Sequence, residues 1–530
     1  MTARAVTIRR ASYPLVLPNI RDPRLHVAAV IISIHVLGQV ALRFQVSVPQ
    51  ILASILTCAI LEVALTFRAT RSFVWPASAM LTGSGVALIL RVVGTPPDDH
   101  WTFYAWYVFA AVGGLSLLTK YAIGRRGSHV FNPSNVGLVV AFLILGSSRV
   151  EPLDFWWAPL EPPMIAAYAV ILVGGLLITR RLRLLALAAT FWVALAAAVG
   201  LLAGSGHCMT ANWAFAPVCG FDFWRVIVTS PEVLIFLFFM ITDPKTVPAG
   251  RVGRVAFGLL VALTSTLLMA PQTDEFGTKV GLLSGLVLWC AARPLLDRFV
   301  PEPRSSADDV RGFLRRLVGG PSVGRSPGRT VGRSVAVAAA VLLVGAGIVA
   351  AGGPARGVVA ADATELLNRV PITINPATLP AIHVGDDVVN FDHRLQGAGI
   401  DAVVVTLGQN LEIENQALLR RDPTLLSAVD HGDRLIEMQG RLSDASATGV
   451  TAIDHYLLDT IDVSLLVPFG RQDGLSLGLA ARGTVAHETY DANGRLLSRQ
   501  TAPFSGTFAL RRATGARWLD VAVLSPGPTP

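Results

Sequence analysis

Long apolar runs recur along the first two thirds of the chain and predict α-helices that cross a lipid bilayer. The hydrocarbon core of a bilayer is about 30 Å thick, so a crossing helix needs about 20 mostly apolar residues. Eleven runs approach or reach this length, at residues 25–42, 51–67, 74–93, 101–119, 135–147, 164–179, 184–203, 223–241, 252–270, 279–292 and 335–351. The fifth and tenth are short, so we expect their ends to be partly buried by protein.

After the last apolar run the pattern changes to that of a water-soluble domain, residues 353–530, which contains no cysteine. Residues 417–442 predict one or two helices. Strands are predicted at residues 451–467, 476–490, 496–500, 507–512 and 517–523. The Asp-Ala-Asn-Gly segment 491–494 predicts a hairpin turn between two of these strands. We therefore expect an α+β domain with a twisted antiparallel sheet.

Composition agrees with a membrane protein. Of the 530 residues, 52% are hydrophobic and only 15% are charged, whereas a soluble domain carries about 25% charged residues. The net charge of +8 would suit a nucleic-acid partner. However, the arginines stand in short loops between apolar runs, where they set membrane orientation instead. We therefore expect lipid, and no nucleic acid, as a partner.

The distribution of Lys and Arg predicts the orientation of the chain, because basic loops stay in the cytoplasm. The basic amino terminus, residues 1–24, and every second loop after it carry most of the bases. The chain is thus expected to be a multi-pass plasma-membrane protein with a cytoplasmic amino terminus and a cytoplasmic linker at 298–334. Residues 353–530 would then be extracytoplasmic. Cys208 and Cys219 share one outside loop and could pair there.

Two stretches interrupt apolar runs with poor helix formers: GSHVFNPSNVGLVVA at 127–141 and MITDPKTVPAGRVGRVAFG at 240–258. Broken helices at membrane depth are tolerated only where they are buried in protein or line a cavity. We interpret the two stretches as walls of one site.

A repeated spacing indicates two related halves. TGSGV at 82–86 followed by TPP at 95–97 matches TSPEV at 229–233 followed by TDP at 242–244. The alternative is a chance recurrence of Thr, Gly and Pro at helix ends.

A second pair, FNPSNVG at 131–137 and FGTKVG at 276–281, has nearly the same offset. Because an odd number of runs separates the members of each pair, the halves would have opposite orientations. The expected fold class is an all-α polytopic membrane protein, with a ten-span 5+5 inverted repeat in residues 25–297. An eleventh span at 335–351 and the extracytoplasmic α+β domain follow it.

Several polar residues at inside helix ends could together cradle a ligand's ring carbonyls or phosphate through helix-end amides and a lysine charge. The candidate binding residues are Asn132, Asn135, Thr242, Asp243, Lys245 and Thr246, with Thr82 and Thr229 from the repeated motifs. Taken singly, each is explained by helix capping or, for Lys245, by inside anchoring. Taken together, they favour a site.

Other polar residues allow two interpretations. Glu62 lies inside the second run, where an ionisable group indicates a functional role. The other interpretation is that Glu62 lies near the membrane surface and pairs with Arg68.

The aromatic residues between Trp101 and Tyr107 are typical of an interfacial belt. His207 and Cys208 are too few for a metal site. The chain has no P-loop and no HExxH, CxxC or Ser/His/Asp signature.

The motifs FNPSNVG (131–137), ITDPKT (241–246) and TGSGVALIL (82–90) resemble those of one membrane family. It comprises the D subunit of the Rnf electron-transport complex and the B subunit of the sodium-pumping NADH:quinone reductase. The resemblance covers residues 25–297, and the long carboxy-terminal extension is similar to the branch that accompanies enediyne biosynthesis. The end of the chain also resembles the last strands of nuclear-transport-factor-like cone domains.

This resemblance implies a bound flavin. Family members attach FMN to a Thr in an S-G-A-T motif, which this chain lacks; the equivalent loop offers Thr210 and Thr229. We therefore expect non-covalent FMN or riboflavin.

The favoured hypothesis is a flavin-associated electron-transfer component with redox partner subunits, in which the cofactor does the chemistry. The alternative functions are a channel or transporter for a small solute and a membrane anchor that presents its external domain to a partner. A quinone-like molecule is the alternative to flavin as the bound ligand.

Overall fold

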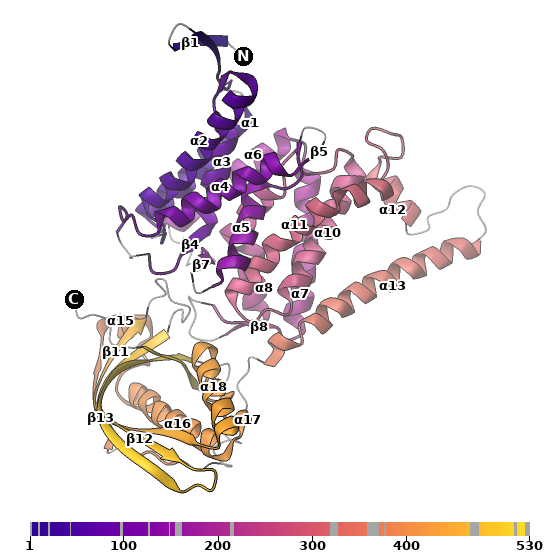
Figure 1. The fold of residues 1–530 in the computed structure, drawn as a ribbon. Coiled ribbons are helices and arrows are strands. Elements are labelled where there is room, and N and C mark those ends of the chain that lie inside the picture. Colours follow the sequence, from indigo (N-terminus) through magenta and orange to yellow (C-terminus); the bar gives the residue numbers. More distant parts are fainter. Residues whose placement is uncertain are drawn as a thin grey trace. The chain divides into compact units, whose positions relative to one another are not determined.

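The computed structural model describes residues 3–8, 11–19, 22–42, 44–95, 99–125, 128–147, 149–153, 162–211, 217–317, 327–357, 370, 372–375, 378–466, 476–512 and 517–524. The chain forms two compact units (Figure 1). The first contains Met1–Cys208 and Cys219–Arg356, and the second contains Met209–Val218 and Gly357–Pro530.

The first unit is helical. Its helices are α1 (Pro23–Val40), α2 (Val48–Thr70), α3 (Ala77–Ile89), α4 (Trp106–Ala122), α5 (Pro133–Leu145), α6 (Pro162–Arg181), α7 (Leu185–Gly204), α8 (Gly220–Thr229), α9 (Pro231–Ile235), the π-helical turn η1 (Phe236–Met240), α10 (Arg251–Met269), α11 (Glu275–Phe299), α12 (Val310–Leu317) and α13 (Pro327–Ala351). Seven helical segments in the described residues are long and apolar enough to cross a membrane: α1, α2, α6, α7, the α8–η1 segment, α10 and α11. The protein is therefore membrane-embedded.

Each of the eleven predicted apolar runs contains a helix, but not every helix has spanning length. Helices α3 and α5 have 13 residues each. The prediction of a span over 74–93 is wrong at its end, because α3 stops at Ile89 and the chain continues as strand β4 (Leu90–Val92). β4 pairs antiparallel with β7 (Val150–Pro152), which follows α5. A buried ion pair, Arg91 to Glu151 at 3.1 Å, joins the two strands.

The eighth predicted span is a broken helix. α8 ends where Ser230 takes an extended conformation, with φ −60° and ψ 145°, and the side chain of Ser230 caps α9 by accepting from the Val233 amide. α9 then runs into the π-helical turn η1. Single π turns inside helices are frequent at functional sites.

Two segments outside the spans are more structured than predicted. The amino terminus forms strands β1 (Ala3–Ile8) and β2 (Ala11–Val16), which pair antiparallel. β2 also pairs in parallel with β3 (Phe73–Val74). The predicted linker 298–334 contains α12 and the beginning of α13. Asp308 within it accepts hydrogen bonds from the amides of Arg251 and Val252, at 3.0 and 2.9 Å. The linker therefore caps α10.

The second unit is an α+β domain. Its elements are β10 (Ala381–Val384), α15 (Asp386–Phe391), α16 (Ala398–Arg420), α17 (Pro423–Leu426), α18 (Gly432–Thr448), β11 (Thr451–Leu466), β12 (Ser476–Tyr490), β13 (Leu496–Arg512) and β14 (Trp518–Leu524). The five strands form one sheet in the order β10-β11-β12-β13-β14. The sheet curves around α16 (Figure 1), and apolar residues of α16 such as Val403 and Leu407 pack against it.

The predicted hairpin at 491–494 is confirmed, since it joins β12 to β13. The prediction of two strands at 496–500 and 507–512 is wrong, because both belong to β13. β12 is long enough to pair along all of it, from Tyr490 with Leu496 to Leu477 with Leu510. Pro503 is tolerated because β14 pairs only with Thr507–Arg512 and leaves this part of β13 at an edge.

The helical segment also begins earlier than predicted and forms three helices, α16 to α18. β10 adds a parallel edge strand, so the sheet is mixed.

Candidate functional site

A cavity of about 380 Å³ lies in the helical unit. Small-molecule sites usually have volumes of about 300–1,000 Å³. Its wall comes from α1, α3, the start of α5, the end of α6, and η1 with the turn after it. The polar residues in the wall are Asp22, Arg24, Ser78, Thr82, His129, Asn132, Ser134, Thr242, Asp243 and Lys245. The cavity therefore combines groups that are far apart in the sequence.

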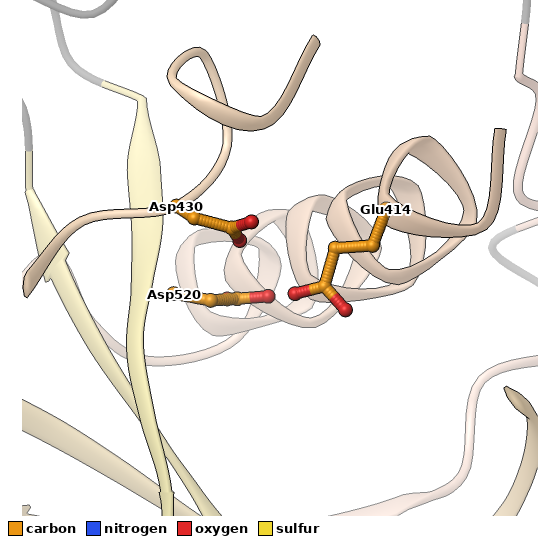
Figure 2. Close-up of side chains that lie close together, drawn as sticks. All are labelled: Glu414, Asp430 and Asp520. Carbon is orange, nitrogen blue, oxygen red and sulfur yellow. The ribbon is translucent and has the colours of Figure 1, made fainter. Parts of the chain in front are cut away.

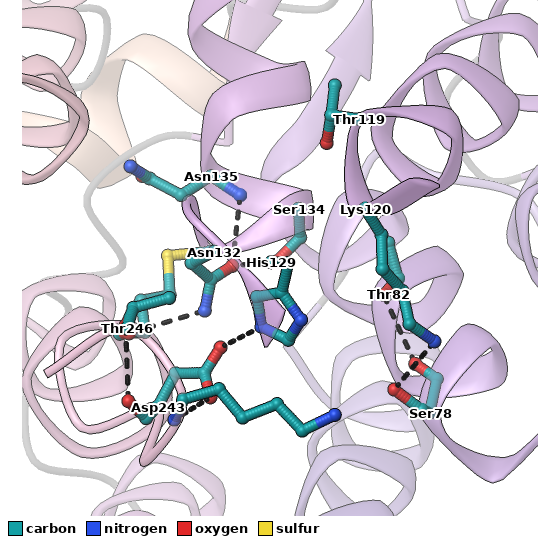
Figure 3. A network of polar contacts seen from close by, with 12 residues as sticks. Ser78, Thr82, Thr119, Lys120, His129, Asn132, Ser134, Asn135, Asp243 and Thr246 are labelled. Carbon is teal, nitrogen blue, oxygen red and sulfur yellow. Dashed lines mark hydrogen bonds and ion pairs between the residues drawn. The ribbon is translucent and has the colours of Figure 1, made fainter. Parts of the chain in front are cut away.

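A side-chain hydrogen bond joins the two interrupted stretches. His129 Nε2 lies 2.9 Å from Asp243 Oδ2 (Figure 3). The side chains are 7% and 17% exposed, so this contact is shielded from water and stronger than one at the surface. It fixes the loop before α5 against the turn that follows η1.

Asn132 is both a helix cap and a cross-link. Its Oδ1 accepts from the Asn135 amide at 3.2 Å and from Ser134 Oγ at 2.9 Å, and Pro133 occupies the first turn of α5. Its Nδ2 donates to the Met240 carbonyl at 3.3 Å. Asn132 therefore caps α5, as the sequence allows, and the same side chain also joins α5 to the end of η1.

The turn that carries Asp243 is held from several sides. Asp243 Oδ1 accepts from the Lys245 amide at 3.0 Å, and the Asp243 carbonyl accepts from Thr246 Oγ1 at 3.1 Å. Arg293 of α11 donates to the carbonyls of Lys245 and Thr246 at 3.0 and 3.1 Å. This turn is preorganised, and it leaves the Lys245 side chain exposed at the edge of the cavity.

The remaining wall is apolar. Ile235, Phe238 and Phe239 line it from α9 and η1. Phe238 packs directly over Gly175 of α6, where a β-carbon would collide with its ring. The position of this aromatic side chain is thus set by the absence of a side chain at Gly175.

The structure brings five of the eight predicted binding residues to the cavity: Thr82, Asn132, Thr242, Asp243 and Lys245. Thr82 and Thr242 turn their hydroxyls to their own helices, donating to the carbonyls of Ser78 and Phe238. The other three predicted residues do not line it.

Those three have structural contacts elsewhere. Asn135 donates to the Leu283 carbonyl of α11 at 3.0 Å. Thr246 is buried behind the Asp243 turn. Thr229 donates to the Arg225 carbonyl at 2.7 Å near the α8–α9 break.

Glu62 does not pair with Arg68, so that interpretation is wrong. Lys120 Nζ lies 2.8 Å from Glu62 Oε1, and Tyr121 donates to Glu62 Oε2 at 2.5 Å. Lys120 also reaches Ser78 Oγ of the cavity wall at 3.4 Å (Figure 3). An ionisable pair inside the helices therefore borders the cavity.

Five further polar residues line the cavity and are not among the predicted ones: Asp22, Arg24, Ser78, His129 and Ser134. His129 stands three residues before Asn132 in an interrupted stretch, and this spacing was the available signal. Ser78 is a small polar residue at the start of an apolar helix and carries no comparable signal.

In the loop between α7 and α8, Cys208 and Cys219 form the disulfide that their position in one loop allows. They join strands β8 (Cys208–Met209) and β9 (Val218–Cys219). Cys58 and Cys290 are buried free thiols.

The chain matches no protein-family model, and a search of the curated proteins gives no significant match.

Proposed function

We propose that the helical unit binds a non-covalent flavin, FMN or riboflavin, in the 380 Å³ cavity and serves as an electron-transfer component of a membrane. One observation carries the proposal. The three motifs at 82–90, 131–137 and 241–246, which resemble those of a flavin-carrying family, all contribute residues to this single cavity. Motifs that served only as separate helix ends would have no reason to converge.

The residues of the cavity suit a flavin. Phe238, Phe239 and Ile235 offer an apolar surface for a flat ring system. His129, Asn132 and Asp243 present polar groups at one side of the same space, where a ring's carbonyls and nitrogens need partners (Figure 3). Lys245 at the edge supplies a point charge for the phosphate of FMN. The bound flavin would supply the redox chemistry, while these residues bind and orient it.

The purified protein is therefore expected to show the absorption band of a flavin and to release the flavin on denaturation. A denaturing gel viewed under ultraviolet light should show no fluorescent band, since the S-G-A-T motif is missing. A fluorescent band that disappears in Thr229→Val or Thr210→Val would contradict non-covalent binding.

Gly175→Ala tests the cavity itself. The added β-carbon would displace the Phe238 ring, so flavin content per chain should fall. Gly204→Ala is the matched control, because a β-carbon there meets no atom within 4 Å. Equal flavin content in the two variants would place the flavin elsewhere.

We further propose the 5+5 inverted repeat in residues 25–297, with the ends of the repeated motifs meeting at a shared interface. In support, the motif at 82–86 lies on the short helix α3, and its match at 229–233 lies at the α8–α9 break. Inverted repeats place ligand sites between such discontinuous helices.

The proposed orientation has the amino terminus in the cytoplasm and residues 353–530 outside. Alkaline phosphatase fused after Pro530 should be active, and the same enzyme fused after Arg304 should be inactive, because it folds only outside the cytoplasm. The basic loops motivate this expectation. The reverse pattern would overturn the count of spans.

A small-solute transporter is the second candidate. The observation in its favour is the interruption of the membrane helix at Ser230 together with the π turn at Phe236–Met240, since broken helices are typical of transporter sites. Colourless protein that accelerates solute flux in vesicles would support it. If the protein binds a flavin as first proposed, its partners would be redox subunits or a quinone.

A further inference from the structure

Three buried carboxylates converge in the α+β domain, far from the cavity residues in the sequence. Glu414 comes from α16, Asp430 from the segment before α18, and Asp520 from β14 (Figure 2). One oxygen of each lies within 4.8 Å of the others. The residues are only 3%, 1% and 1% exposed.

Much of this negative charge has no hydrogen-bond donor among the described residues. Both oxygens of Asp430 and Oδ2 of Asp520 are buried and receive no hydrogen bond from an amide, hydroxyl or basic group in the described part of the chain, and Asp430 meets the carboxyl group of Glu414 instead. Asp520 Oδ1 accepts from Asn410 Nδ2 at 3.3 Å, and Glu414 is bound by Arg434. A buried carboxylate that lacks partners is very costly, and the Asp430 side chain points into the cluster (Figure 2).

The neighbouring arginines do not balance the cluster. Arg434 contacts Glu414 at 2.5 Å and also Glu437 at 3.0 Å. Arg517 reaches the cluster through Asn410, donating to its Oδ1 at 2.6 Å. Three buried carboxylates (Glu414, Asp430 and Asp520) face two guanidinium groups (Arg434 and Arg517), and Arg434 is shared with the exposed Glu437, so a bound cation would add positive charge that the arginines do not supply. Burial, and after it the charge of Glu414, raise the pKa of Asp430 and of Asp520 well above the ordinary value.

The backbone holds the carboxylates in place. Asp430 and Asp520 face each other in a parallel bridge. The Asp520 amide donates to the Val429 carbonyl and the His431 amide donates to the Asp520 carbonyl, both at 2.8 Å. Asn410 adds a bond to the Trp518 carbonyl at 3.0 Å. Because the backbone fixes these carboxylates, they are preorganised for a ligand and need not move when it binds.

We propose that Asp430, Asp520 and Glu414 form a binding site for Ca²⁺ in the α+β domain. The donors are all carboxylate oxygens, which suit hard cations and not the nitrogen and sulfur preferences of Zn²⁺ or Cu²⁺. Mg²⁺ usually keeps several waters, whereas Ca²⁺ accepts many protein oxygens in an irregular geometry. The irregular arrangement of these carboxylates therefore favours Ca²⁺, whose shell of about 6–8 oxygens would be completed by water. This site is independent of the proposed flavin.

The test uses the full chain in detergent. Protein treated with EGTA and dialysed against Ca²⁺ should hold one Ca²⁺ per chain by elemental analysis, and Ca²⁺ should raise its Tm. Asp430→Asn and Asp520→Asn should each lose the ion and the Ca²⁺-dependent rise in Tm. Asp462→Asn should keep both, because that carboxylate is exposed on β11 beside His383.

The wild type provides the decisive result, so the test does not depend on the variants folding. Wild-type chain with no bound Ca²⁺ and the same Tm in Ca²⁺ and EGTA would overturn the proposal. Ca²⁺ retained by Asp430→Asn would also overturn it, as would Mg²⁺ raising the wild-type Tm as much as Ca²⁺ at equal concentration.

Discussion

Arg434→Met is expected to destabilise the α+β domain by about 3–5 kcal/mol, since breaking a buried ion pair leaves an uncompensated charge. Arg434 is 4% exposed, and its guanidinium binds Glu414 at 2.8 and 2.5 Å. Without this guanidinium group, the buried Glu414 carboxylate would lie beside Asp430 and Asp520 with no positive charge among the described residues in contact with it. The loss should appear as a lower urea midpoint for proteolysis of residues 357–530 in the full chain, measured in EGTA.

Arg441→Met is the matched control. Arg441 pairs with Asp454 at 3.1 Å but its side chain is 28% exposed, so its removal should cost less than about 1 kcal/mol. The double variant Arg434→Met with Glu414→Gln should be more stable than Arg434→Met alone, because the orphaned charge is gone. A loss of less than about 1 kcal/mol for Arg434→Met would show that the cluster is already protonated or neutralised.

In the helical unit, His129→Gln and Asp243→Asn are expected to be non-additive, with a coupling free energy of about 0.5–3 kcal/mol. The two side chains share one hydrogen bond of 2.9 Å in the wall of the cavity, so either change removes the same contact. Each single variant should also lower the flavin content, because both residues line the cavity. The measurement is a double-mutant cycle on unfolding in detergent, with flavin stoichiometry from the same samples.

Asp222→Asn combined with His129→Gln is the control cycle. Asp222 pairs with Arg225 on α8 and its side chain is 67% exposed, so the two effects should add within about 0.3–0.5 kcal/mol. Additivity of His129 and Asp243 with unchanged flavin content would leave both as structural residues, and the proposed site would have to move.

The positions of the helices follow from the sequence, because apolar side chains must face lipid or a packed interior and a helix satisfies its own backbone. All eleven apolar runs therefore contain helices. The ends of these helices depend on residues elsewhere. α3 stops at Ile89 because Leu90–Val92 pairs with Val150–Pro152. In the α+β domain, β13 continues past Pro503 because β12 offers a partner along its whole length.

The candidate cavity was partly predictable. The sequence predicts Asn132 and Asp243 because polar helix breakers are costly at membrane depth unless they line a site, and it predicts Lys245 as a point charge for the ligand. Their partner His129 and the position of Phe238 were not predictable, because the contact of His129 with Asp243 and that of Phe238 with Gly175 depend on packing. The same holds for Thr229, which the repeat suggested and the fold directs away from the cavity.

The buried acidic cluster could not be found from the sequence. Glu414, Asp430 and Asp520 have no metal-ligand spacing in the sequence, so no metal site is predicted from them. Each is an ordinary acid of a polar domain until α16 packs beside β14 and the bridge forms between residues 430 and 520. The apolar helices, the α+β domain and the interrupted stretches can be predicted from the sequence, because they depend on local composition. Which charges are buried together depends on how the chain packs, since burial is a property of the packed chain and not of the residue.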